Sequence, residues 1–247
     1  MSAIFIISLI IIIAFSATLF RSTFGFGEAL IAVPLLSLFL PIGMAVSLAV
    51  MMSILVALVV VIHDHSKIHF HSAKWLILYA FLGIPVGLFI LSYGNEAIVK
   101  IILGLIIILY AIYSLVGKNT IKLEKDSKIW LFVCGFLSGV LGGAYGANGP
   151  PLVVYGNLRQ WDAQHFRATL QAYFLPAGLF SMIGYVSEGL INAQILLYFL
   201  YSIPVIIFAV FIGRYLNKKI KGNAFYKYVY CGLILIGVVM ILNSLFL

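Results

Sequence analysis

The stretch GGAYGANGPP, residues 142–151, places glycines and two prolines inside one of the most apolar parts of the chain. Both residue types interrupt helices, yet long apolar runs flank them on each side. The chain has 247 residues, of which 64% are hydrophobic and 9% are charged, with a mean hydropathy of +1.18. So few charges do not cover a soluble domain of this length. We therefore expect a membrane protein whose helices are broken at defined points.

The apolar runs predict helices that cross the membrane. Several have about 18 or more residues without a charge, enough to span a hydrocarbon core of about 30 Å, whereas a transmembrane barrel would show alternating segments of about ten residues. We predict an all-α polytopic membrane protein with helices at 3–20, 28–40, 43–62, 75–92, 97–116, 129–141, 147–156, 166–186, 193–213 and 225–246. Segments 28–40 and 147–156 are too short to cross unaided. The sequence leaves open whether 3–20 and 129–141 cross fully or form re-entrant hairpins with these neighbours.

The two halves of the chain resemble each other. FGFGEALIAVPLL (24–36) matches LGGAYGANGPPLVV (141–154) when Pro34 is laid on Pro151, which also lays Gly25 on Gly142. A second match, LGIPVGLFI (82–90) with YSIPVIIFAVFIG (201–213), has almost the same register. The pattern predicts two repeats, each with a broken or re-entrant short helix after a Gly-rich turn. We place them at residues 1–117 and 129–247, joined by a cytoplasmic linker at 118–128.

The distribution of charge predicts that the repeats are inverted. If each repeat crosses the membrane an odd number of times, loops 63–74, 117–128, 157–165 and 214–227 lie on one side. That side then holds every Lys and Arg except Arg21 and Lys100, when Arg167 at the helix border is included. The positive-inside rule therefore favours inverted repeats with both termini outside. The net charge of +8 is spread over short loops rather than one basic face, so we expect no nucleic-acid partner.

The Gly-rich turns predict an anion site. Irregular backbone at membrane depth persists only where it is buried in protein or lines a wet cavity. A Gly-rich turn before a short helix turns bare N–H groups toward such a cavity, at the positive end of the helix dipole. Close helix packing is the alternative role for glycine in membranes. We assign substrate binding to Gly25, Gly27, Gly142, Gly143, Asn148 and Gly149, and helix breaking to Pro34, Pro150 and Pro151.

Ionisable and amide side chains near these turns extend the site. Glu28 opens the first short helix, and a carboxyl group at membrane depth indicates a function. We interpret it as the carrier of a coupling proton, with a structural pairing to Arg21 as the alternative. Arg167 suits an oxyanion because its guanidinium donates two parallel hydrogen bonds, although an arginine at a helix border also reaches lipid phosphates. Thr169 and Gln171 follow on the same helix as neutral donors.

Other classes of function have weaker signals. HDHSKIHFH (63–71) holds four histidines, which leaves a metal-handling protein as an alternative, but the spacing matches no common metal site. Motifs for nucleophilic catalysis, zinc proteolysis or phosphate binding are missing from the sequence. We therefore expect a protein that is not an enzyme and has no cofactor or metal. The sequence leaves open whether the chain forms a homo-oligomer.

FGFGEALIAVPLL, GGAYGANGPPLVVYG and HFRATLQAYFLP occur in the order found in the TauE/SafE family of sulfite exporter-like permeases, which this chain resembles over nearly its whole length. The resemblance implies secondary transport of sulfite, sulfonates or related anions across the bacterial inner membrane. Many members carry a run of glycines where this chain has GFGEA, so Glu28 is a departure from the common pattern. We predict a transporter of a small anion that works by alternating access, with proton coupling through Glu28 and an anion channel as an alternative.

Overall fold

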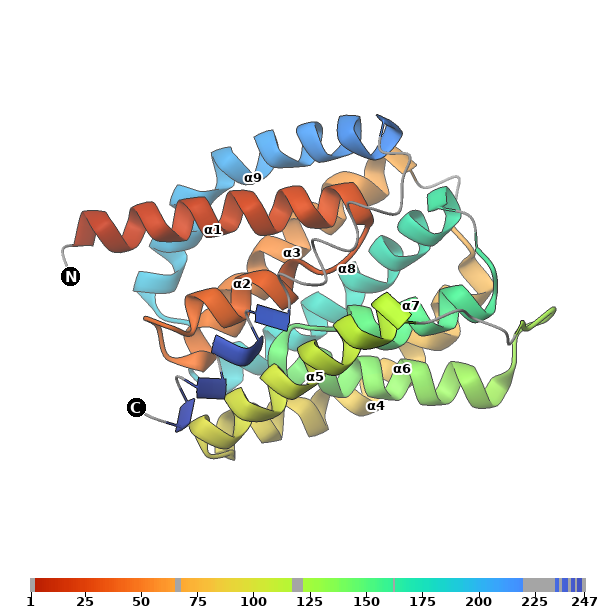
Figure 1. The fold of residues 1–247 in the computed structure, drawn as a ribbon, viewed down its shortest axis with the longest axis horizontal. Coiled ribbons are helices and arrows are strands. Elements are labelled where there is room, and N and C mark those ends of the chain that lie inside the picture. The colour runs from red at the N-terminus through yellow and green to blue at the C-terminus, as the bar shows by residue number, and fades with distance from the viewer. Residues whose placement is uncertain are drawn as a thin grey trace.

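A computed structural model shows that the protein is all-α, as the apolar runs predicted. The structure describes residues 3–64, 68–116, 122–161, 163–219 and, nearer the C-terminus, 234, 235, 237–239, 241, 242, 244 and 245. The described helices are α1 (Ala3–Phe24), α2 (Glu28–Leu36), α3 (Ile42–Asp64), α4 (Phe70–Tyr93), α5 (Glu96–Val116), α6 (Lys128–Tyr145), α7 (Gly149–Leu158), α8 (Ala163–Ser187) and α9 (Ala193–Lys219) (Figure 1). The predicted helix 225–246 lies mostly outside the described residues.

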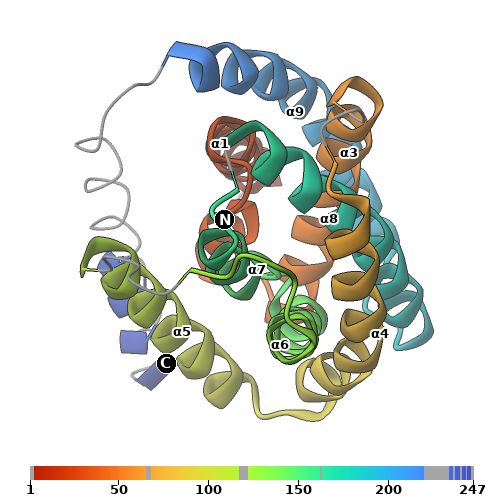
Figure 2. The same ribbon diagram turned by 90° about the vertical axis from the view of Figure 1, so that its right-hand side faces the viewer.

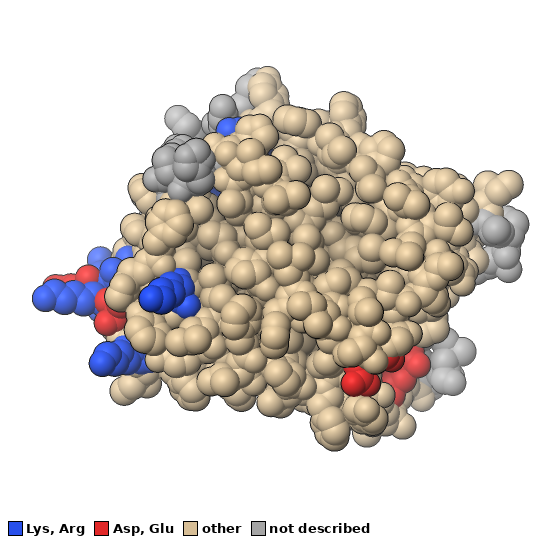
Figure 3. All heavy atoms as spheres, turned by 180° about the vertical axis from the view of Figure 1, so that it is seen from behind, with Lys and Arg blue, Asp and Glu red and all other residues tan. Residues whose placement is uncertain are grey.

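The chain is a multi-pass membrane protein. Within the described part, six helices are long and apolar enough to cross a bilayer, namely α1, α3, α4, α5, α6 and α9. Large apolar side chains such as Ile183, Phe89 and Phe208 point outward, which lipid tolerates and water does not. Figure 3 shows Lys and Arg side chains, with acidic side chains among them, toward one end of the molecule, acidic side chains alone toward the other, and an uncharged band between them.

Helix α8 has 25 residues but is less apolar than the other long helices. The cause is a polar stretch in its first half, where Arg167, Thr169 and Gln171 are all buried. Its second half exposes Leu179 and Ile183. The polar side chains therefore face the protein interior, where neighbouring groups replace water as hydrogen-bond partners.

Helices α6 and α7 form a hairpin that returns the chain to the end at which α6 begins. The backbone N–H of Leu123 donates to the carbonyl of Leu158 at 2.8 Å, so α7 ends beside the segment that leads into α6. The Tyr155 hydroxyl donates to Asp126 at 2.6 Å and strengthens this closure. In α1 and α2 the same reversal brings Thr18 within 2.8 Å of Glu28, and α2 lies alongside α1 (Figure 1). Figure 2 shows these segments toward the centre of the bundle.

The point at which the second hairpin breaks differs from the prediction. Gly142 and Gly143 were expected to form an open turn, but they lie inside α6, which continues to Tyr145. The helix ends at Gly146, whose φ of 64° is a left-handed conformation that suits glycine. A Cβ atom on Gly143 would lie 2.3 Å from the carbonyl oxygen of Ile84 in α4. Gly143 is thus a close-packing residue, the role that small residues have at membrane helix interfaces.

Candidate functional site

One small cavity lies between the two hairpin turns. It has a volume of about 20 Å³ and is lined by Arg21, Gly27, Glu28, Ala29, Leu30, Ser53, Gly146, Ala147, Asn148, Gly149 and Phe174. Its wall therefore combines the N-terminal ends of α2 and α7 with side chains from α1, α3 and α8. The volume is enough for ordered water. The prediction that the two turns approach each other agrees with this lining.

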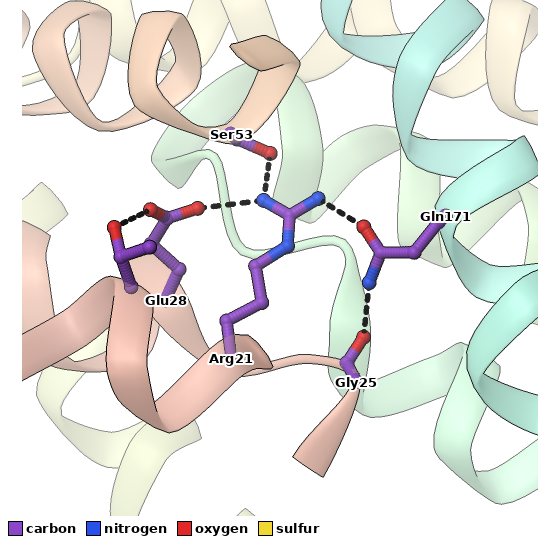
Figure 4. A network of polar contacts seen from close by, with 6 residues as sticks. Arg21, Gly25, Glu28, Ser53 and Gln171 are labelled. Carbon is purple, nitrogen blue, oxygen red and sulfur yellow. Dashed lines mark hydrogen bonds and ion pairs between the residues drawn. The ribbon is translucent and has the colours of Figure 1, made fainter. Parts of the chain in front are cut away.

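Arg21 is the most heavily bonded side chain at the cavity. It is 2% exposed and comes from α1. Its Nη1 atom donates to Glu28 Oε2 at 2.6 Å and also to the hydroxyl of Ser53, and Nη2 donates to Gln171 Oε1 at 2.7 Å (Figure 4). The ring of Phe174 lies 4.8 Å from the guanidinium carbon, within cation–π range. Side chains of α2, α3 and α8 thus contact the Arg21 guanidinium.

Glu28 balances this charge. It is also 2% exposed, and its second oxygen, Oε1, accepts a hydrogen bond from Thr18 at 2.8 Å. Its position at the first residue of α2 places the carboxylate at the positive end of a helix dipole. Each charge alone would be strongly disfavoured at this depth, whereas the close pair is tolerated. The structure contains the Arg21 pairing that the sequence offered as an alternative role for Glu28.

Arg21 is not among the site residues that the sequence predicted. The sequence predicts a helix that ends at residue 20, which places Arg21 in the turn that follows. In the structure α1 continues to Phe24, and the arginine lies inside the span. The signal that could have identified it is its isolation. An ionisable residue attached to a long apolar segment indicates a function wherever the helix places it within the membrane.

Some of the predicted site residues line the cavity and the others do not. Gly27, Glu28, Asn148 and Gly149 line the cavity. Gly25 and Gln171 lie directly behind it, because Gln171 Nε2 donates to the Gly25 carbonyl at 2.7 Å while its other end holds Arg21. Gly142 supports Asn148, since a Cβ at residue 142 would lie 2.1 Å from Asn148 Nδ2. The other predicted positions are outside the cavity lining: Gly143, Arg167 and Thr169, and the helix-breaking Pro34, Pro150 and Pro151.

Arg167 and Thr169 have different surroundings from those expected. Arg167 lies beside Gly25, with its Cα 3.4 Å from where a Cβ of that glycine would be. It lines a second cavity of about 10 Å³ together with His63 of α3 and Arg214 of α9. Thr169 accepts a hydrogen bond from the backbone N–H of His69 at 3.0 Å. It therefore fixes the segment before α4 and is not among the residues that line the cavity between the turns.

The number of free amides is smaller than the sequence suggested. At the second turn, Gly146 and Ala147 donate their N–H groups to the carbonyls of Gly142 and Leu141. Pro150 and Pro151 have no N–H to offer. Asn148 and Gly149 are thus the amides of this turn that can face an anion. Pro34 lies within α2, downstream of the three first-turn residues that line the cavity.

The histidine segment is divided among separate contacts. His63 Nδ1 lies 2.7 Å from the carbonyl of Val59, His69 stacks on Trp161 at 5.3 Å, and His71 Nε2 lies 3.9 Å from Asp126. His65 falls outside the described residues. Where side chains are described, groups of three or more His, Cys, Asp or Glu with metal-binding geometry are absent. The described histidines of this segment therefore have different neighbours from one another.

Comparisons with known proteins agree with this architecture. The model of the family described as "Sulfite exporter TauE/SafE" matches residues 10–240. A "Probable sulfite/organosulfonate exporter TauE" of Cupriavidus necator is 24% identical over 135 residues, which cover 53% of this chain and 52% of that protein. The chain thus spans about half the length of this relative. No solved structure matches. Because the family model extends over almost the whole bundle, the chain belongs to the sulfite exporter TauE/SafE family.

Proposed function

We propose that the protein is a secondary transporter that carries a small sulfur-containing anion, sulfite or an organosulfonate, by alternating access. The observation that most supports this proposal is the buried Arg21–Glu28 pair beside a cavity between two hairpin turns. A cation placed in the membrane interior attracts an anion that lipid would exclude. The family and the printed name of the Cupriavidus necator relative support the choice of sulfur anions.

Alternating access would follow from the two repeats moving against each other. Under the predicted correspondence, α1 corresponds to α6, α3 to α8 and α4 to α9. The main contacts between helices recur when each helix is replaced by its counterpart. Helix α4 packs on α6 and α8, and its counterpart α9 packs on α1 and α3. Helices α3 and α8, which correspond to each other, pack together. This reciprocity supports inverted repeats at 1–117 and 129–247, with a substrate site at their interface.

Substrate in this proposal lies between the first turn of α2 and the Asn148–Gly149 amides. Glu28 carries the coupling proton. The second cavity, with Arg167, His63 and Arg214, would attract the anion on its way to or from the site. The positive charges of Arg167 and Arg214 raise the local concentration of anions there.

We expect the basic end of the bundle to face the cytoplasm of a bacterial inner membrane, with both termini outside. In a chain with Cys134 and Cys231 replaced by alanine, single cysteines in place of Lys122 and Lys219 should react with an impermeant maleimide only after the inner face is opened. A cysteine in place of Glu188 should react in intact cells. Labelling of residues 122 and 219 from opposite faces would overturn the inverted arrangement.

Transport is tested by radiolabelled sulfite uptake into proteoliposomes, with and without a pH gradient. The native protein should show saturable flux that responds to the gradient, and Glu28→Gln should lose that response because the amide does not titrate. Lys100→Gln is the matched control. Lys100 pairs with the exposed Glu96 at 3.0 Å, a contact that contributes about 0–1 kcal/mol at a surface.

Two results would contradict parts of this proposal. Flux that rises linearly with concentration and ignores the gradient would indicate an anion channel instead. No flux of sulfite or of any competing sulfonate would leave the fold unchanged and exclude the proposed substrate class. Replacement of His63, His65, His69 and His71 by alanine should leave saturable uptake intact, which distinguishes this proposal from a metal-handling role.

A further inference from the structure

We infer that Arg21 is the group that binds the anion, and that Glu28 is its resident counter-ion, which the substrate displaces and a proton then neutralises. The inference rests on the proposed function and gives its coupling a mechanism. Anion binding and protonation of Glu28 become one event because both depend on the same guanidinium.

The hydrogen bonds of Arg21 show how an incoming anion could be held. A guanidinium has five N–H donors. Three of them reach Glu28, Ser53 and Gln171. The Nε atom is buried and has no acceptor within the described part of the protein. A buried donor without a partner is disfavoured. An oxyanion at Arg21 would therefore gain this donor in addition to the position now held by the Glu28 carboxylate.

The charge around the cavity explains why a proton must accompany the anion. Among the described residues that line it, Arg21 and Glu28 are the two charged side chains. The other groups around the pair are uncharged: Thr18 on α1, Ser53 on α3, Asn148 at the second turn, and Gln171 and Phe174 on α8. A bound monoanion would leave one uncompensated negative charge, which costs several kcal/mol when buried. A proton on Glu28 removes that charge.

The neighbours of Glu28 can accommodate the proton. Thr18 now donates its hydroxyl hydrogen to Glu28 Oε1 at 2.8 Å. A hydroxyl also has acceptor lone pairs. After the carboxylate takes up a proton from the buffered solution, its new O–H can donate to Thr18 Oγ1, whose own hydrogen rotates away. Breaking the ion pair therefore leaves Glu28 with a hydrogen-bond partner. One monoanion and one proton enter together, and the loaded site keeps the net charge of the empty one.

The test measures proton uptake on binding, without transport. Methanesulfonate is the probe, because it stays ionised near neutral pH and any proton taken up must belong to the protein. Titration calorimetry of the purified full chain in two buffers with different ionisation enthalpies gives the number of protons bound. We expect about one proton per methanesulfonate in the native protein, and a dissociation constant that rises about tenfold per pH unit over the pH range in which that proton is taken up.

Glu28→Gln should bind methanesulfonate without proton uptake, with an affinity independent of pH and about tenfold or more above the native value, because the competing carboxylate is gone. Without anion, the melting temperature of Glu28→Gln should be lower than that of the native protein. Methanesulfonate should raise it by more than it raises the native melting temperature. Dimethyl sulfone, which has a similar shape and no charge, should have no effect. The double variant Arg21→Gln/Glu28→Gln leaves no buried charge and should neither bind the anion nor take up a proton.

The outcomes distinguish a failure of this inference about Arg21 and Glu28 from a failure of the proposed transport function. Binding of methanesulfonate to the native protein without proton uptake, or with equal uptake by Glu28→Gln, would overturn the inference while the transport function stands. Binding to the folded double variant would exclude Arg21 as the ligand. If the native protein binds neither methanesulfonate nor sulfite, the proposed function itself is wrong, and this inference fails with it.

Discussion

Replacing Arg21 by glutamine is expected to abolish sulfite flux and to lower the free energy of unfolding by about 3–5 kcal/mol, the usual effect of removing one partner of a buried ion pair. The remaining Glu28 carboxylate would lie 2% exposed without its cation. Gln171 Oε1 and the Ser53 hydroxyl would also lose the donors that now reach them. Flux is lost because no other cation lines the described cavity wall.

Thermal unfolding in detergent and sulfite uptake into proteoliposomes measure the two effects separately. The double variant Arg21→Gln/Glu28→Gln is the essential control, because it removes both charges together. It should regain most of the stability of the native protein and remain without flux. Lys100→Gln should change neither property. If Arg21→Gln kept native stability and flux, neither the site nor its ion pair would have the role proposed.

The second large effect is expected where α4 meets α6. A Cβ atom on Gly87 would lie 2.1 Å from the carbonyl oxygen of Val140, and one on Gly83 would lie 2.2 Å from that of Phe136. Both obstacles are backbone atoms, which move only if the helices separate. Replacing both glycines by alanine should therefore lower stability by about 1–3 kcal/mol per site or more. The hairpin that α6 forms with α7 would lose its position, and flux would fall with it.

Folded yield and melting temperature in detergent measure this effect. Gly43→Ala is the matched control, because the nearest atom to its Cβ, at 3.1 Å, is the flexible end of the Leu190 side chain. That variant should differ little from the native protein. Alanine at both 83 and 87 with an unchanged melting temperature would show that the helices have more freedom to separate than these contacts imply.

Much of the fold could be predicted from the sequence. Apolar runs must be helical in lipid, since each backbone polar group there needs a partner within its own segment. The short helices 28–40 and 147–156 were recognised because Gly and Pro punctuate them, and the structure has α2 and α7 at these places. Four cavity-lining residues, Gly27, Glu28, Asn148 and Gly149, were likewise predicted from their positions at the turns.

Other parts of the site could not be predicted, because glycine has two uses in a membrane. It opens a turn at Gly146, where φ is positive, and it permits contact between helices at Gly143, where the backbone remains helical. Local composition is the same in both cases. What separates them is the presence of α4 next to Gly143, a contact between residues far apart in the chain.

By itself, the sequence determined that this protein crosses a membrane, that its helices break at two Gly- and Pro-rich turns, and that it has the motifs of its family. Only the tertiary structure decided that the charge of Arg21 lies at the cavity between the two turns. Arg21, Ser53 and Gln171 lie on three different helices, and no spacing along the chain relates them. They meet because a cation inside lipid is stable only when several elements supply its partners, a condition that exists only after the helices have packed.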